Sequence, residues 1–160
     1  MAIFKVNGQS VQPEKNQKLL RFLRDELHLT SVKDGCSEGA CGACTVIMDG
    51  RTVNSCVTLN AQAEGRKVTT IEGLAGDRMA DVIKKAYVEE GAVQCGFCTP
   101  GMVLSTYVLL KENPKPTQDE VRDGLSGNLC RCTGYTAIIR AVLRAAKELS
   151  GKESEKEGSD

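Results

Sequence analysis

Short stretches of alternating apolar and polar residues run through the first half of the chain and predict strands. Two turns between them are Asn-Gly and Asp-Gly pairs, at residues 7–8 and 49–50, and such pairs are typical of tight hairpins. The predicted strands cover residues 2–6, 10–12, 45–48, 51–53 and 68–71. Residues 18–27 place four leucines on one face of a helix. The order hairpin, helix, hairpin, strand is that of a β-grasp domain, which we expect over residues 1–76.

Beyond Gly76 the apolar positions change from strand spacing to helical spacing. The predicted helices comprise apolar faces at residues 79–87, 103–110 and 138–149, and a helix that begins at the capping box of Thr117 and Glu120. We therefore expect an α+β protein in which a compact four-helix domain over residues 77–150 follows the β-grasp domain. Residues 151–160 contain no apolar side chain, which predicts a disordered tail.

Length and charge limit the class of protein. A chain of 160 residues buries about 69% of its extended surface on folding, enough for one ordinary domain or two small ones. The 21 basic and 21 acidic side chains give zero net charge, which argues against a nucleic-acid binder. No apolar run is long enough to span a membrane, and the first residues do not resemble a secretory signal. We expect a cytoplasmic protein.

Eight cysteines are the most informative residues of the sequence. A reducing cytoplasm disfavours pairing all of them in disulfides, although a secreted disulfide-bonded protein is one alternative. Two metal sites with four thiolates each are the leading hypothesis. The two sets of four are Cys36, Cys41, Cys44 and Cys56, followed by Cys95, Cys98, Cys130 and Cys132.

The first set has the C-x4-C-x2-C spacing of plant-type [2Fe–2S] ferredoxins, followed by a more distant cysteine. Gly35, Gly39 and Gly42 lie among these cysteines. Glycine allows the positive φ angles that a loop needs to direct backbone N–H groups at negatively charged sulfur. A structural zinc site is the alternative, but its usual ligand pairs are C-x2-C units. The spacing therefore favours an iron–sulfur cluster.

The second set combines a C-x2-C pair with a C-x-C pair, and each pair precedes a predicted helix start. These starts are at Thr99-Pro100 and near Gly134-Tyr135. Free N–H groups at a helix N-terminus stabilise thiolates and anionic clusters. The spacing alone leaves zinc and iron open for this site.

In combination, the plant-type loop, GAVQCGFCTPGM and SGNLCRCTGY resemble the iron–sulfur subunit of the molybdenum hydroxylases. This family includes xanthine dehydrogenase, aldehyde oxidoreductase, nicotinate dehydrogenase and carbon monoxide dehydrogenase. The resemblance covers about residues 2–149, with these motifs in the order of the family. The gap between Cys44 and Cys56 is shorter than in free plant-type ferredoxins but fits the bacterial small subunits.

The resemblance implies two [2Fe–2S] clusters, the one on the N-terminal domain being farther from molybdenum. It also implies that Gln94 and Cys132 contact the molybdopterin cofactor of a large subunit. The loops at residues 94–98 and 130–135 would then face that subunit, and the loop at residues 35–44 would face a medium subunit that binds FAD. On this hypothesis, electrons from a purine, another N-heterocycle or an aldehyde pass through the chain toward the flavin.

The sequence contains no dinucleotide-binding glycine motif, no P-loop and no zinc-protease motif. Its only histidine, His28, is predicted to lie at the end of the first helix, and no nucleophile is paired with a base. We therefore expect no substrate chemistry in this chain alone and predict an electron-transfer subunit. The alternative is a zinc-stabilised interaction module without redox activity.

Overall fold

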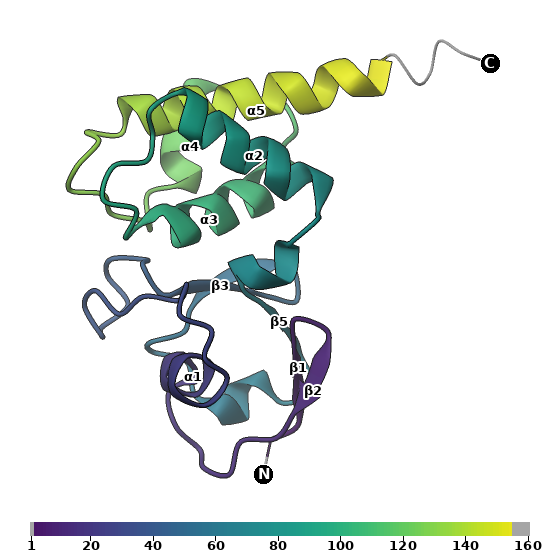
Figure 1. The fold of residues 1–160 in the computed structure, drawn as a ribbon, viewed down its shortest axis with the longest axis vertical. Helices are drawn as coiled ribbons and strands as arrows, with labels where there is room; N and C mark the ends of the chain where they lie inside the picture. The colour runs from purple at the N-terminus through teal and green to yellow at the C-terminus, as the bar shows by residue number, and fades with distance from the viewer. Residues whose placement is uncertain (1, 155–160) are drawn as a thin grey trace.

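The computed structural model describes residues 2–154 and contains a mixed five-stranded sheet below a group of helices (Figure 1). The sheet has the order β2-β1-β5-β3-β4, in which β1 and β5 are parallel and the other neighbours are antiparallel. The strands are β1 (Phe4–Val6), β2 (Gln9–Val11), β3 (Thr45–Met48), β4 (Arg51–Asn54) and β5 (Lys67–Thr69). This is the arrangement predicted from the hairpins, with a crossover between β2 and β3.

The predicted strand at residues 68–71 extends too far at its end. Strand β5 ends at Thr69, and the 3₁₀ helix η3 (Ile71–Leu74) begins two residues later. The Asn7 side chain causes this change of direction, because its amide donates to Thr70 Oγ1 and its oxygen accepts from Thr70 N. A Cβ at Gly73 would lie 2.2 Å from the same Asn7 oxygen, so the turn requires glycine there.

The predicted helix at residues 18–27 is shorter and less regular than an α-helix of that length. Helix α1 (Leu19–Arg21) forms one turn and continues as the π-helix η1 (Phe22–Glu26), in which Leu27 N donates to Phe22 O over 3.1 Å. Phe22 is buried at the beginning of this wider turn, and its ring packs edge-to-face with the Phe4 ring, with centroids 5.7 Å apart. The 3₁₀ helix η2 (Asn60–Ala63) also belongs to this half.

Four helices form the second half of the chain, as predicted. They are α2 (Arg78–Glu89), α3 (Thr99–Glu112), α4 (Gln118–Gly124) and α5 (Thr136–Ser154). The capping box of Thr117 and Glu120 is present at the beginning of α4. Helix α5 continues to Ser154, so the first residues of the predicted tail are helical. The rest of that tail lies outside the described residues.

Helix α3 lies between the sheet and the other helices (Figure 1). The predicted apolar face at Val103, Tyr107 and Leu110 is buried, but so are all the residues from 101 to 108. A helix enclosed on all sides is apolar on all sides. Strand β3 contributes Ile47 to the helical core, so α3 joins the two halves through one continuous layer of side chains. No described helix has the length and apolar character needed to cross a bilayer.

Candidate metal centres

The first set of cysteines lies where the loop before β3 meets the end of β4. Cys36 and Cys41 are half-buried in the loop, whereas Cys44 and Cys56 are each only 1% exposed. The Ser55 hydroxyl donates to Cys44 O over 2.7 Å, and the Asn54 amide donates to Gly39 O over 2.8 Å. The end of β4 therefore holds the loop at two carbonyl groups and brings Cys56 to it.

Backbone N–H groups of this loop point at its sulfur atoms, as the sequence predicted. The amides of Glu38 and Cys41 are hydrogen-bonded to the Cys36 thiol and lower its pKa to about 7. Gly39 and Gly42 have positive φ angles of 84° and 69°, which this wrapping requires. The expectation for Gly35 was wrong: its φ is not positive, and glycine is needed there because a Cβ would lie 2.9 Å from Cys41 Sγ.

Burial has the opposite effect on the pKa of two other thiols of this site, Cys56 and Cys41. It raises the pKa of Cys56 to about 11, with a further contribution from the neighbouring Cys44 thiol. Burial also raises the pKa of Cys41, against the hydrogen bond from the Ala43 amide. A thiol must lose its proton to bind a metal, so a positive metal centre would supply the stabilisation that these thiolates lack in its absence.

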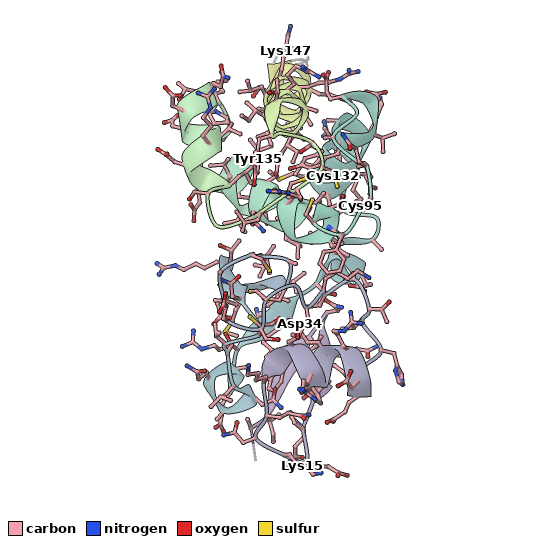
Figure 2. The ribbon with its side chains drawn as sticks, turned by 90° about the vertical axis from the view of Figure 1, so that its left-hand side faces the viewer. Lys15, Asp34, Cys95, Cys132, Tyr135 and Lys147 are labelled. Carbon is pink, nitrogen blue, oxygen red and sulfur yellow. The ribbon has the colours of Figure 1, made fainter. Side chains whose placement is uncertain are left out.

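The second set of cysteines lies on two loops of the helical half. Cys95 Sγ and Cys132 Sγ are 3.6 Å apart, and both residues are exposed. Figure 2 shows these two residues together on one face of the molecule, with Asp34, which precedes Cys36, below them on the same face. Gln94 is exposed beside Cys95. The outer part of this site is therefore open to a partner.

Cys98 and Cys130 form the inner part of the second site and are half-buried. The sequence predicted the cap of α3 at Thr99, but the N-cap residue is Cys98, so the helix begins one residue earlier than predicted. Burial and the adjacent Cys130 thiol raise the pKa of Cys98 to about 12. Burial also acts on Cys130, but hydrogen bonds from the Thr133 hydroxyl at 3.1 Å and the Thr133 amide at 3.5 Å outweigh it and lower its pKa.

The four thiols of each set form two close pairs. The paired cysteines are Cys36 with Cys41, Cys44 with Cys56, Cys95 with Cys132, and Cys98 with Cys130. Within residues 2–154, no three His, Cys, Asp or Glu side chains are grouped to hold a single metal ion. A [2Fe–2S] cluster takes two thiolates on each of its two irons. Two pairs of thiols with amides directed at sulfur fit such a cluster.

Three polar residues that the sequence analysis did not single out shape these sites. Asp34 accepts from Ser37 N over 3.0 Å and so closes the turn around Cys36. Thr133 donates to Cys130 as described, and Asn54 holds the Gly39 carbonyl. Asp, Asn and Thr readily bond to nearby backbone or side chains in turns, and this tendency was the available signal for Asp34 and Thr133.

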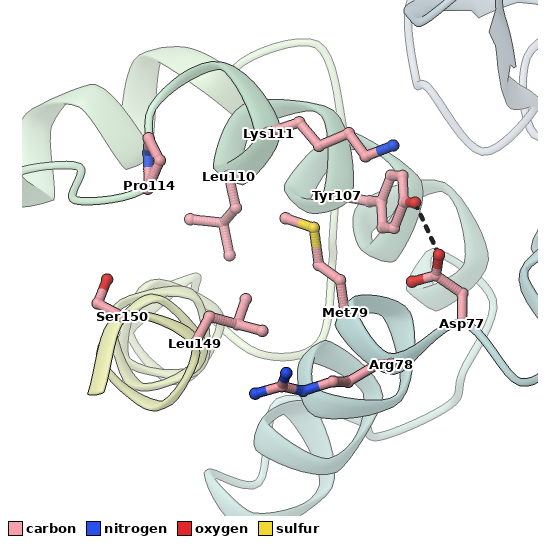
Figure 3. Close-up of a pocket in the computed structure, with 9 residues that line it drawn as sticks. All are labelled: Asp77, Arg78, Met79, Tyr107, Leu110, Lys111, Pro114, Leu149 and Ser150. Carbon is pink, nitrogen blue, oxygen red and sulfur yellow. Dashed lines mark hydrogen bonds between the residues drawn. The ribbon is translucent and has the colours of Figure 1, made fainter. Parts of the chain in front are cut away.

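A surface cavity of about 480 Å³ lies at the ends of α2, α3 and α5, and none of the eight cysteines lines it (Figure 3). The Tyr107 hydroxyl donates to Asp77 over 3.0 Å across its rim, and Lys111 Nζ lies 4.7 Å from the centre of the Tyr107 ring. These contacts join α3 to the beginning of α2. The cavity is separate from the metal centres.

The fold and the two sets of thiols define a protein with two [2Fe–2S] domains. Residues 4–75 match the family described as 2Fe-2S iron-sulfur cluster binding domain, and residues 70–143 match the [2Fe-2S] binding domain family. The nicotinate dehydrogenase small FeS subunit of Eubacterium barkeri is 49% identical over 144 residues, covering 89% of this chain and 92% of its own length. The xanthine dehydrogenase iron-sulfur-binding subunit of Escherichia coli O157:H7 is 50% identical over 131 residues, covering 81% and 82%. The chain belongs to the iron–sulfur subunits of the molybdenum hydroxylases.

Solved structures agree with this family. The chain matches quinoline 2-oxidoreductase from Pseudomonas putida 86 with a TM-score of 0.82 and 40% identity, covering 95% of this chain and 96% of that one. It matches aldehyde oxidoreductase from Desulfovibrio desulfuricans ATCC 27774 with a TM-score of 0.86 and 43% identity. That match covers 94% of this chain but only 17% of the much longer oxidoreductase chain.

The predicted function is confirmed at this level. The chain is an electron-transfer subunit of an oxidoreductase, and its two domains bind two [2Fe–2S] clusters. The alternative of a zinc-stabilised module without redox activity is not favoured, because both halves of the chain match [2Fe–2S]-binding families. The subunits named among its relatives belong to multi-subunit enzymes, so this chain also works with partner subunits.

Proposed function

We propose that each set of four cysteines binds one cluster. The ligands of the first cluster are Cys36, Cys41, Cys44 and Cys56, and those of the second are Cys95, Cys98, Cys130 and Cys132. The observation that carries this proposal is the division of each set into two thiol pairs with loop amides directed at sulfur. Each bound cluster supplies one-electron redox chemistry, and the residues around it tune its potential through burial and hydrogen bonds.

The exposed part of the second site is proposed to face a large subunit that carries molybdopterin. There Gln94 and Cys132 would contact the pterin, since both are exposed next to Cys95. Apolar side chains are also exposed around this site: Phe97 is 45% exposed and Leu129 is 54% exposed. Large apolar residues on a surface favour burial against a partner.

The loop of the first site would face a medium subunit that binds FAD. Its tip is exposed at Ser37 and Glu38, so the outer edge of this site can be approached from solvent. Electrons would enter at Cys95 and Cys132 and leave near Cys36. The zero net charge of the chain suits permanent subunit contacts rather than long-range steering of a charged partner.

The substrate of the assembled enzyme is proposed to be a purine, another N-heterocycle or an aldehyde. The names of the relatives support this range, because they specify nicotinate, xanthine, quinoline and aldehyde enzymes. We propose a cytoplasmic location, since the eight cysteines are free and a reducing compartment keeps thiols available for metal.

Metal analysis and EPR test the ligand assignment. The purified chain should contain about four iron and four sulfide, two of each per cluster, and should give two EPR signals after reduction. Cys44→Ser should remove the first signal and Cys95→Ser the second, each with about half the iron. Ala40→Ser, at an exposed position of the first loop, should keep both signals. Stoichiometric zinc without iron would contradict the assignment.

The pterin contact is tested with Gln94→Ala in the assembled enzyme. We expect lower turnover or weaker retention of the molybdenum cofactor, with the iron content of the small subunit unchanged. Gln118→Ala is the matched control, because Gln118 is an exposed glutamine at the start of α4. Unchanged turnover and unchanged cofactor retention in Gln94→Ala would remove the proposed contact.

A further inference from the structure

The loop of the first site lies directly against the segment that precedes Cys130. Leu129 N donates to Cys41 O over 2.9 Å. This backbone hydrogen bond joins a cysteine of the first set to the residue that precedes Cys130 of the second set. The approach is very close, because a Cβ at Gly42 would lie 2.2 Å from Gly127 O. A Cβ at Gly101, in the first turn of α3, would lie 2.5 Å from Gly42 O. The two sites therefore share one packed backbone junction.

Asn128 is the side chain at the centre of this junction and is only 6% exposed. Its amide nitrogen donates to Gly42 O over 3.0 Å and to Thr45 Oγ1 over 3.2 Å. Its oxygen accepts from Ser105 Oγ over 2.7 Å. One side chain thus connects the first loop, the beginning of β3 and the middle of α3.

We propose that Asn128 is a positioning residue that sets the spacing between the two metal centres. This inference rests on the assignment of the eight cysteines as ligands. Asn128 precedes Cys130 by two residues, and Gly42, which it holds, follows Cys41 directly. Movement of Asn128 relative to Gly42 therefore changes the separation of one ligand of each site. A buried polar group with all its hydrogen bonds made keeps its neighbours in a single arrangement.

Asparagine is suited to this position because it donates on one side and accepts on the other. An aspartate of the same shape accepts from Ser105 but cannot donate to the Gly42 carbonyl. In Asn128→Asp, two acceptors would face each other where a hydrogen bond of 3.0 Å now holds the loop. The junction should open at this point, while the cysteine side chains stay unchanged.

The test compares the magnetic interaction between the two reduced centres in holoprotein variants. This interaction falls steeply with separation, and electron transfer between the centres slows in the same direction. We expect Asn128→Asp to keep both EPR signals and its iron, to show a weaker splitting, and to exchange electrons between the centres several-fold more slowly. Ser105→Ala, which frees the other end of the amide, should produce a smaller change in the same direction.

Tyr107→Phe is the control for a lost hydrogen bond at a buried position of α3, because its hydroxyl contacts Asp77 and neither cysteine loop (Figure 3). It should leave splitting and exchange rate at wild-type values. If Asn128→Asp is destabilised but has wild-type splitting and rate, Asn128 is only structural and the inference fails. If Asn128→Asp loses iron, an unchanged splitting in Ser105→Ala overturns the inference. Absence of a second signal in the wild type would instead contradict the ligand assignment.

Discussion

At the scale of single residues, glycines of similar backbone conformation have different reasons to be glycine. Gly42 and Gly50 have φ angles of 69° and 85°. A side chain at Gly50 would meet open space, whereas one at Gly42 would meet Gly127 O and Asn128. Glycine is therefore required at position 50 only by the backbone geometry of the β3–β4 turn. At position 42 it is also required by the close contact between the two sites.

Gly42→Ala should destabilise the holoprotein by about 2 kcal/mol or more, because the backbone must move to relieve the overlap. Gly50→Ala carries the same left-handed strain without a clash and should cost about 1 kcal/mol. Denaturant unfolding followed by circular dichroism measures both. Iron analysis should show loss of metal from Gly42→Ala alone. Equal effects of the two substitutions would mean that the loop accommodates a side chain at Gly42.

At the scale of elements, ion pairs at the end of α2 join it to α5. Glu90 accepts from Arg140 Nε over 3.2 Å and from Arg144 over 3.1 Å. The hydrogen bonds from Arg144 and Arg140 hold the pKa of Glu90 below its usual value of 4.5. The carboxylate is therefore stabilised in the folded state. Its contribution to folding is present above pH 4.5 and is lost as the pH falls through the lowered pKa.

Glu90→Gln should therefore unfold at a lower temperature than the wild type at pH 7, and the difference should shrink as the pH falls below the usual glutamate pKa of 4.5. The effect should be small, because Arg140 and Arg144 are 58% and 45% exposed. Thermal melts between pH 3 and pH 7 measure it. Asp119→Asn removes a charge from an exposed pair within α4 and is the control. A difference that is constant with pH would rule out the proposed linkage.

Elements governed by local signals were predicted well from the sequence. Asn7-Gly8 and Asp49-Gly50 located both hairpins, and the capping box located α4. The π-helical turn at Phe22 was not predicted. Over so short a segment, the spacing of leucines does not distinguish a π-helix, with hydrogen bonds between residues i and i+5, from an α-helix. Cysteine spacing identified both sites. Asn128 was not identified, because its partners are distant in the sequence.

At the scale of the whole molecule, the two halves meet through α3, Ile47 and the junction around Asn128. Metal bound in the first loop therefore stabilises a surface on which the helical half packs. Binding to the folded state raises the free energy of unfolding, and this gain is lost when the metal is removed. Loss of metal from the first loop should therefore lower the free energy of unfolding of the helical half as well.

Removal of iron with a chelator under reducing conditions should lower the melting temperature of both halves together. Calorimetry should show one transition in the apoprotein, at a lower temperature than in the holoprotein, and addition of iron and sulfide should restore it. Two separated transitions, with the helical half melting as before, would show that the junction does not couple the halves.

The junction also affects the order in which the protein can mature during synthesis. Gly42 and Asn128 are separated by 86 positions, so the first loop leaves the ribosome long before the side chain that holds it. Until residues 128 and 129 have been synthesised, the Gly42 carbonyl lacks its hydrogen bond from Asn128, and the Cys41 carbonyl lacks its hydrogen bond from Leu129. Cluster insertion at the N-terminal site should therefore follow translation of the segment that contains Asn128 and Leu129.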